Sequence, residues 1–181
     1  MRAGASFLQF AGGLEVHASR AGEVLLGWRD ELERDRGARA ALRRAQTTDD
    51  VVMEPAFHRL RNHPDWPSSI SLDTAASIAI AVAELDVAFA PLAVRLGAAL
   101  GGGRTPVSPG RLRLIASAEI PQQFLRLLRG ALAQIDGRAP LIDLAEKVRQ
   151  WHWAGSRPMA RRDLLIDYFD AAPATVLSKE E

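Results

Sequence analysis

Nearly every patterned segment of this sequence repeats its apolar residues with the period of an α-helix. The clearest case is residues 119–135, where the apolar side chains on one side are Ile120, Phe124, Leu127, Leu128, Ala131, Leu132 and Ile135. The opposite side carries Gln122, Arg126 and Arg129. This spacing gives a helix one apolar and one polar face. No segment sustains the alternation of a half-buried strand, so the sequence predicts an all-α fold.

The same period and the usual end signals predict further helices. Before residue 101 they cover residues 22–34, 38–45, 55–60, 73–89 and 91–100, with Ser71 or Asp73 as a cap and a polar turn over residues 47–50. Later helices begin at Pro109 after a Ser108 cap, at Pro140 with the stripe Leu141, Leu144, Ala145, Val148 and Trp151, and at Ser156 and Pro158. Proline at the first helical position and serine before it are typical helix starts.

A glycine- and proline-rich stretch over residues 101–110 interrupts this helical pattern. Such composition is typical of a linker. We therefore expect two small helical bundles joined by a Gly/Pro-rich linker. The expected parts are an N-terminal extension (1–21), an N-terminal bundle (22–103), a C-terminal bundle (104–173) and a tail (174–181).

The amino-acid composition excludes several classes of protein. The chain has 181 residues, of which 48% are hydrophobic, and it has no cysteine, which excludes disulfides and thiolate chemistry. The apolar run over residues 74–100 contains Glu84, Asp86 and Pro91, which argues against a membrane helix. Phe7 to Phe10 is too short for a signal peptide. We expect a cytoplasmic protein that does not contact a membrane.

The sequence offers no pattern that argues for catalysis. The four histidines lack the spacing of metal ligands, and the triple glycine at 101–103 lacks the Gly-Lys-Ser/Thr of a phosphate loop. Acid pairs such as Asp163 and Asp167 lie on faces that read as solvated, and His152 lies on an apolar stripe. We therefore expect no enzyme activity, cofactor, metal or small-molecule substrate. An enzyme whose catalytic residues are distant in sequence stays open as an alternative.

Arginine is the remaining feature. In residues 36–45, Arg36, Arg39 and Arg43 share the face opposite Ala38, Ala41, Leu42 and Ala45, with Arg44 beside them. Guanidinium groups in such a row suit phosphate, which arginine grips through a bidentate fork. The alternative is a solvated face paired internally with Asp30, Glu31, Glu33 and Asp35. Because the net charge is only +1, nucleic-acid binding requires such local patches.

Three further arginine clusters follow along the chain. They are Arg111 and Arg113 with Arg104 upstream, then Arg126 and Arg129, then Arg157, Arg161 and Arg162. Each is either a phosphate contact or a surface salt bridge. Arg161 falls within an apolar arc, which indicates a buried, paired arginine with a structural role. Among the tryptophans, Trp66 and Trp153 are the candidates for exposed stacking platforms.

Several of these pieces occur together, in order, in a known family. The chain resembles CasB, the small subunit of the type I-E CRISPR surveillance complex Cascade. The resemblance rests on the Trp28 helix, on ARAALRRA at 38–45, on PAFHRL at 55–60, and on the C-terminal stretch from GRLRLIASAEIPQQFLRLLRGAL through WHW to RRDLLIDYF. Together these pieces span most of residues 24–170, whereas residues 61–105 match weakly.

The resemblance implies an all-α protein of two helical bundles with no catalytic activity. It implies binding to the CRISPR RNA (crRNA) and to both strands of the target DNA, including the displaced strand of the R-loop, in antiviral defence. Its other partners would be Cascade protein subunits and a second copy of itself. The positions implied for nucleic-acid binding are Arg43, Arg44, Arg111, Arg113, Arg126, Arg129, Arg157, Arg161 and Arg162. The alternative is a helical adaptor or regulator that binds protein only.

Overall fold

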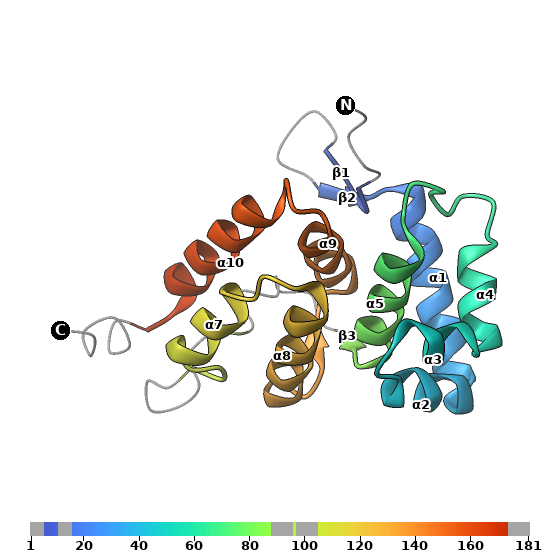
Figure 1. The fold of residues 1–181 in the computed structure, drawn as a ribbon, viewed down its shortest axis with the longest axis horizontal. Helices are drawn as coiled ribbons and strands as arrows, with labels where there is room; N and C mark the ends of the chain where they lie inside the picture. Colours follow the sequence, from blue (N-terminus) through green and yellow to red (C-terminus); the bar gives the residue numbers. More distant parts are fainter. Residues whose placement is uncertain (1–5, 11–15, 88–95, 97–104, 174–181) are drawn as a thin grey trace. The chain divides into compact units, whose positions relative to one another are not determined.

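The computed structural model describes residues 6–10, 16–87, 96 and 105–173 (Figure 1). These residues form mainly helices, and the strands among them are only two or three residues long. Strand β1 (Leu8–Phe10) pairs antiparallel with β2 (Val16–Ala18), and β3 (Asp86–Val87) pairs parallel with β4 (Arg138–Ala139). The all-α prediction is confirmed.

The chain divides into two compact units. Unit 1 consists of Met1–Glu84 and Leu141–Arg149, and unit 2 of Leu85–Pro140 and Gln150–Glu181. The glycine-rich half of the predicted linker (residues 101–104), most of the predicted helix over residues 91–100 and the predicted tail lie outside the described residues.

Unit 1 contains five complete helices and, from later in the chain, most of α9 (Leu141–His152). The complete helices are α1 (Arg20–Arg34), α2 (Arg36–Arg44), α3 (Thr48–Val52), α4 (Pro55–Arg61) and α5 (Leu72–Ala83). Helix α5 is buried from Thr74 through Ala83. Its many alanines are small, and the neighbouring helices can therefore pack against it on several sides. The helical period predicts that Val24, Leu25, Trp28 and Leu32 of α1 face inward. Leu25, Trp28 and Leu32 are buried in the core, whereas Val24 is half-buried. The indole Nε1 of Trp28 donates a 2.8 Å hydrogen bond to the carbonyl of Ala56, which fixes the ring against α4.

Two predicted boundaries in unit 1 are wrong. Residues 47–50 start a helix rather than form a turn, because Thr47 and Asp50 make a reciprocal capping box at the start of α3. The Asp50 carboxylate accepts hydrogen bonds from the backbone N–H groups of Gln46 and Thr47 and from the Thr47 side chain. These hydrogen bonds hold the pKa of Asp50 below its usual value. Helix α5 ends at Ala83 rather than Phe89, since the chain then pairs as β3 with β4.

Unit 2 contains α7 (Pro109–Ala116), α8 (Pro121–Gln134), the end of α9 (Leu141–His152) and α10 (Arg157–Ala171). Ser108 caps α7 and Pro109 is its first residue, as predicted. The predicted stripe of α9 is buried along its whole length. On α8 the apolar face is confirmed at Phe124, Leu128, Ala131, Leu132 and Ile135. Leu127 is only half-buried, and Ile120, which precedes the first helical residue, is 58% exposed.

The core of unit 2 centres on one tryptophan. The ring of Trp151 stacks on Phe124 of α8, with centroids 3.9 Å apart and planes inclined by 9°. Its Nε1 donates a 2.9 Å hydrogen bond to the carbonyl of Ala118. Tyr168 of α10 donates its hydroxyl proton to the carbonyl of Val107 at 2.6 Å. These contacts fasten α8, α9 and α10 to the segments that precede α7 and α8.

Candidate nucleic-acid interface

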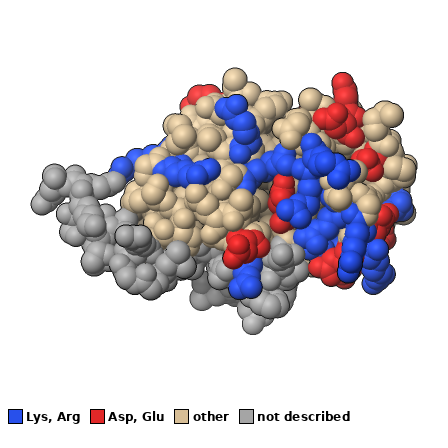
Figure 2. All heavy atoms as spheres, turned by 90° about the horizontal axis from the view of Figure 1, so that it is seen from below, with Lys and Arg blue, Asp and Glu red and all other residues tan. Residues whose placement is uncertain are grey.

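The arginines of α2 line one open groove. Glu33, Arg36, Arg39, Ala40, Arg43 and Arg44 enclose a volume of about 590 Å³, which we call the arginine groove. Figure 2 shows Lys and Arg side chains crowded over the part of the molecule where Figure 1 places α1 and α2. Leu42 and Ala45 bury the other side of the helix, so α2 must turn its arginines outward.

Two of the four arginines also hold α2 to the end of α5. Arg39 donates from Nε to the carbonyl of Ala83 at 3.1 Å, and Arg43 donates from Nε to Glu84 at 3.2 Å. Arg36 and Arg44 are exposed, and neither has an ion pair within the described part of the chain. The groove therefore presents two anchored guanidinium groups beside two that project into solvent.

Three of the four acids that internal pairing would require approach other arginines, and Asp30, the fourth, is exposed. Glu33 pairs with Arg29 at 2.9 Å. Glu31 and Asp35 approach Arg59 at 3.4 and 3.6 Å. Asp35 also caps α2 by accepting a 3.0 Å hydrogen bond from the backbone of Ala38. This arrangement leaves the positive charge of Arg36 and Arg44 available at the groove.

Arg29 is a buried arginine that sequence reasoning missed. Its side chain is 2% exposed, although the residue belongs to the charged run after Trp28. The available signal was Glu33 four residues later, the spacing of an ion pair along one helix. A single spacing does not distinguish a buried pair from an exposed one, because burial depends on what packs over α1.

In unit 2, the arginines on α7 and α8 have mixed environments. Arg113 is exposed, with its guanidinium carbon 5.8 Å from the centroid of the Phe169 ring. The guanidinium of Arg111 lies so close to Gly130 that a Cβ there would meet its Nη2 at 2.5 Å. Arg126 is exposed and Arg129 is half-buried. The upstream Arg104 lies outside the described residues.

The last arginine cluster is organised by one carboxylate. Arg161 binds Glu119 at 2.7 Å, and Arg157 reaches the other oxygen of the same carboxylate at 3.6 Å. Arg157 also donates to the carbonyl of Trp151 at 3.1 Å. Arg157 and Arg161 therefore tie the start of α10 to Glu119 and Trp151, whereas Arg162 is exposed. Arg161 is paired, as predicted, but its side chain is 34% exposed rather than buried.

The hydrogen bond and positive charge of Arg161 hold the pKa of Glu119 below its usual value of 4.5. A lowered pKa means that the interaction stabilises the fold above the unfolded pKa and is lost as the pH falls through the folded pKa. We expect Arg161→Ala to raise the pKa of Glu119 toward its usual value, measured by carboxyl ¹³C NMR titration. Arg162→Ala is the control and leaves this pKa unchanged. An unaltered Glu119 titration in Arg161→Ala would show that the pair does not persist in solution.

The two candidate stacking platforms differ. Trp66 is only 7% exposed and packs against Phe7 with centroids 5.7 Å apart, so it is not a platform. The sequence did not reveal this because Phe7 is distant along the chain. Trp153 is 48% exposed and keeps an accessible ring. His152, expected in the core, is half-buried.

Among the described residues, no group of three or more His, Asp or Glu side chains is arranged to hold a metal ion. No helix in the described ranges is long and apolar enough to cross a membrane.

The comparisons with known proteins identify one family. The family model for the CRISPR-associated protein Cse2 matches residues 38–169, which run from α2 into α10. No curated protein and no solved structure matches the chain.

Proposed function

The chain belongs to the CRISPR-associated Cse2 family and is thus a Cascade subunit, and we propose that it holds nucleic-acid backbone there without reading sequence. The resemblance to CasB is confirmed. The family is a structural one, and other Cascade subunits are its partners. The finer role that we propose is contact with the crRNA and the target DNA, which stabilises the R-loop by retaining the displaced strand, with a second copy of the chain beside it.

The observation that carries this proposal is the arginine groove. Phosphates are spaced regularly along a strand, and arginine binds them in bidentate geometry whatever the base. In an RNA-guided complex, base pairing with the guide supplies sequence specificity, so the protein needs only backbone contacts. Strand exchange is nearly balanced in energy, and modest backbone contacts are therefore enough to favour the open R-loop.

The same reasoning ranks the other arginines. Arg44, Arg113, Arg126 and Arg162 are exposed and suit direct phosphate contact. Arg157 and Arg161 share Glu119, so we propose that they position the start of α10 and add positive charge there. The competing function, a protein-only adaptor, requires the exposed arginines to meet acidic partner surfaces instead.

The variant Arg126→Ala/Arg129→Ala separates these two functions. We expect the assembled complex to capture target DNA more weakly, because α8 loses two cationic side chains. Each lost phosphate contact reduces the slope of log affinity against log salt by about 0.9 for duplex DNA or about 0.7 for a single strand. The preference among target sequences stays the same. An unchanged affinity and salt slope removes these two residues from the interface.

A further inference from the structure

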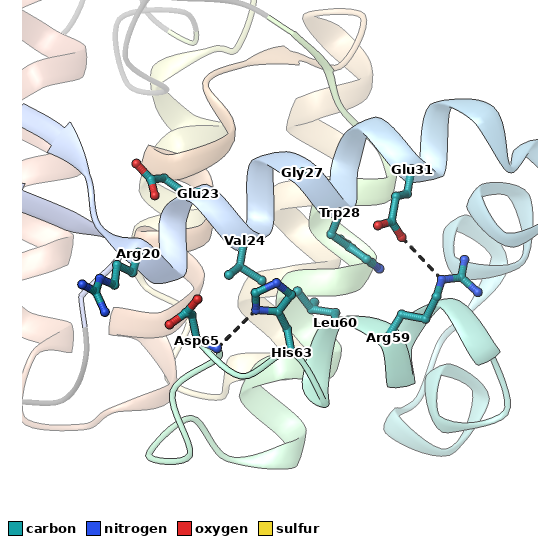
Figure 3. Close-up of a pocket in the computed structure, with 10 residues that line it drawn as sticks. All are labelled: Arg20, Glu23, Val24, Gly27, Trp28, Glu31, Arg59, Leu60, His63 and Asp65. Carbon is teal, nitrogen blue, oxygen red and sulfur yellow. Dashed lines mark hydrogen bonds and ion pairs between the residues drawn. The ribbon is translucent and has the colours of Figure 1, made fainter.

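A second pocket lies on α1, in unit 1. One wall is a single stripe of that helix, at the spacings that place residues on one face: Arg20, Glu23, Val24, Gly27, Trp28 and Glu31. The facing wall comes from the end of α4 and the loop after it, with Leu60, His63 and Asp65 (Figure 3). Its volume is about 370 Å³, near the lower end for ligand pockets. It has room for one long side chain.

Gly27 is in the pocket wall, and packing within unit 1 does not explain it. A Cβ built at Gly27 has nothing within 4 Å, whereas one at Gly22 of the same helix would meet the Phe7 carbonyl oxygen at 2.7 Å. Glycine weakens a helix interior relative to alanine because it adds backbone freedom to the unfolded chain. Gly22 is therefore required by its surroundings, whereas at Gly27 the missing side chain leaves this part of the pocket wall open.

Some charged side chains in the pocket have ion-pair partners and others have none among the described residues. Arg59 at one end is held by Glu31 and by Asp35 outside the pocket. At the other end, Glu23 and Asp65 have no ion pair within the described ranges, and neither has Arg20. His63 accepts a 3.2 Å hydrogen bond at Nδ1 from the backbone N–H of Asp65. Two carboxylates against one arginine leave this end with an excess of negative charge.

The floor between the two ends is apolar. Val24, Trp28 and Leu60 form it, and Trp28 is fixed by its hydrogen bond to Ala56. An aliphatic stem with a cationic head matches this layout, because the stem covers apolar surface while the head reaches the carboxylates.

We propose that the α1 pocket binds an arginine side chain from a neighbouring protein. The stem lies on Val24, Trp28 and Leu60 beside Gly27, and the guanidinium binds Glu23 and Asp65. The site is separate from the arginine groove, whose lining shares no residue with it. It gives the chain a protein-docking point of opposite charge to its proposed nucleic-acid surface, and it does not depend on that surface.

The full chain and a small probe test the proposal. The probe is N-acetyl-arginine methylamide, and the readout is the ¹H–¹⁵N signal of the Trp28 indole. We expect a saturable shift with a dissociation constant on the order of 1 mM, as suits one side chain. The citrulline analogue, of the same shape without the charge, should bind at least about tenfold more weakly, because hydrogen bonds to charged groups are the stronger ones.

Two variants examine the two halves of the site. Glu23→Gln/Asp65→Asn keeps the side-chain shapes and is expected to weaken probe binding at least about tenfold. Gly27→Leu fills the pocket and is expected to abolish the shift. Gly110→Leu is its matched control, since Gly110 is also exposed in a helix with nothing within 4 Å of a Cβ, and it should leave binding unchanged.

Three results would overturn the proposal. The first is equal affinity for the arginine and citrulline probes, and the second is undiminished binding in Gly27→Leu. The third is an indole shift produced by a short oligonucleotide or inorganic phosphate while the arginine probe gives none, which would assign the pocket to nucleic acid.

Discussion

Replacing Trp151 by alanine is expected to lower the free energy of unfolding by about 3–5 kcal/mol, the range for removing a large buried aromatic side chain. The ring is fully buried and stacks on Phe124. The truncation leaves a cavity at the junction of α8 and α9 and leaves the carbonyl of Ala118 without its indole donor. Urea unfolding followed by far-UV circular dichroism measures the change.

Trp153 provides a matched control two residues later. It is 48% exposed, so Trp153→Ala should change stability by no more than about 0.5 kcal/mol. Trp151→Phe should fall between the two, because it restores most of the stacked area without the hydrogen bond. If Trp151→Ala and Trp153→Ala prove equally mild, Trp151 is not the centre of the unit 2 core.

Reversing one charge in the arginine groove is expected to impair target binding strongly. Arg44 is exposed, has no ion pair among the described residues, and ends α2, so Arg44→Glu should leave the fold intact. The variant removes a charged contact and adds repulsion toward phosphate. We expect the assembled complex to bind target DNA about tenfold or more weakly, since a hydrogen bond to a charged group contributes about 1.5–3 kcal/mol. Binding at several salt concentrations measures both the loss and the change in slope.

Arg61→Glu is the control for this effect. Arg61 is likewise exposed and is likewise the last residue of its helix, α4, but it does not line the groove. The two variants change the net charge equally, so a general electrostatic effect would weaken binding by the same factor in both. Equal losses would therefore argue against a specific role of the groove.

The helices were predictable where local signals agreed. In α9, five buried residues repeat at helical spacing, and in α7 serine and proline mark the start, so neighbours along the chain carry the information. The outward direction of the α2 arginines followed in the same way from Leu42 and Ala45 on the opposite face. Such features depend on the spacing of apolar residues and on helix-capping residues, both of which can be read from the sequence.

The rest depends on contacts between distant residues. Arg157 and Arg161 converge on Glu119, and Arg39 reaches Ala83, only because tertiary packing brings those segments together. Trp66 is buried by Phe7 for the same reason. Periodicity therefore identified arginine-rich faces, but it did not separate arginines that hold the fold from those that project into solvent.

The central claim is that the arginine groove contacts nucleic acid in the assembled complex. The most direct test places a photo-crosslinking benzoylphenylalanine at Ala40, which lines the groove, in Cascade bound to target DNA. Met53, which is 81% exposed and outside the groove, is the control position. We predict that crosslinks from position 40 join the chain to crRNA or DNA and that position 53 gives few. Crosslinks from position 40 to protein subunits alone would contradict the claim and support the protein-only adaptor.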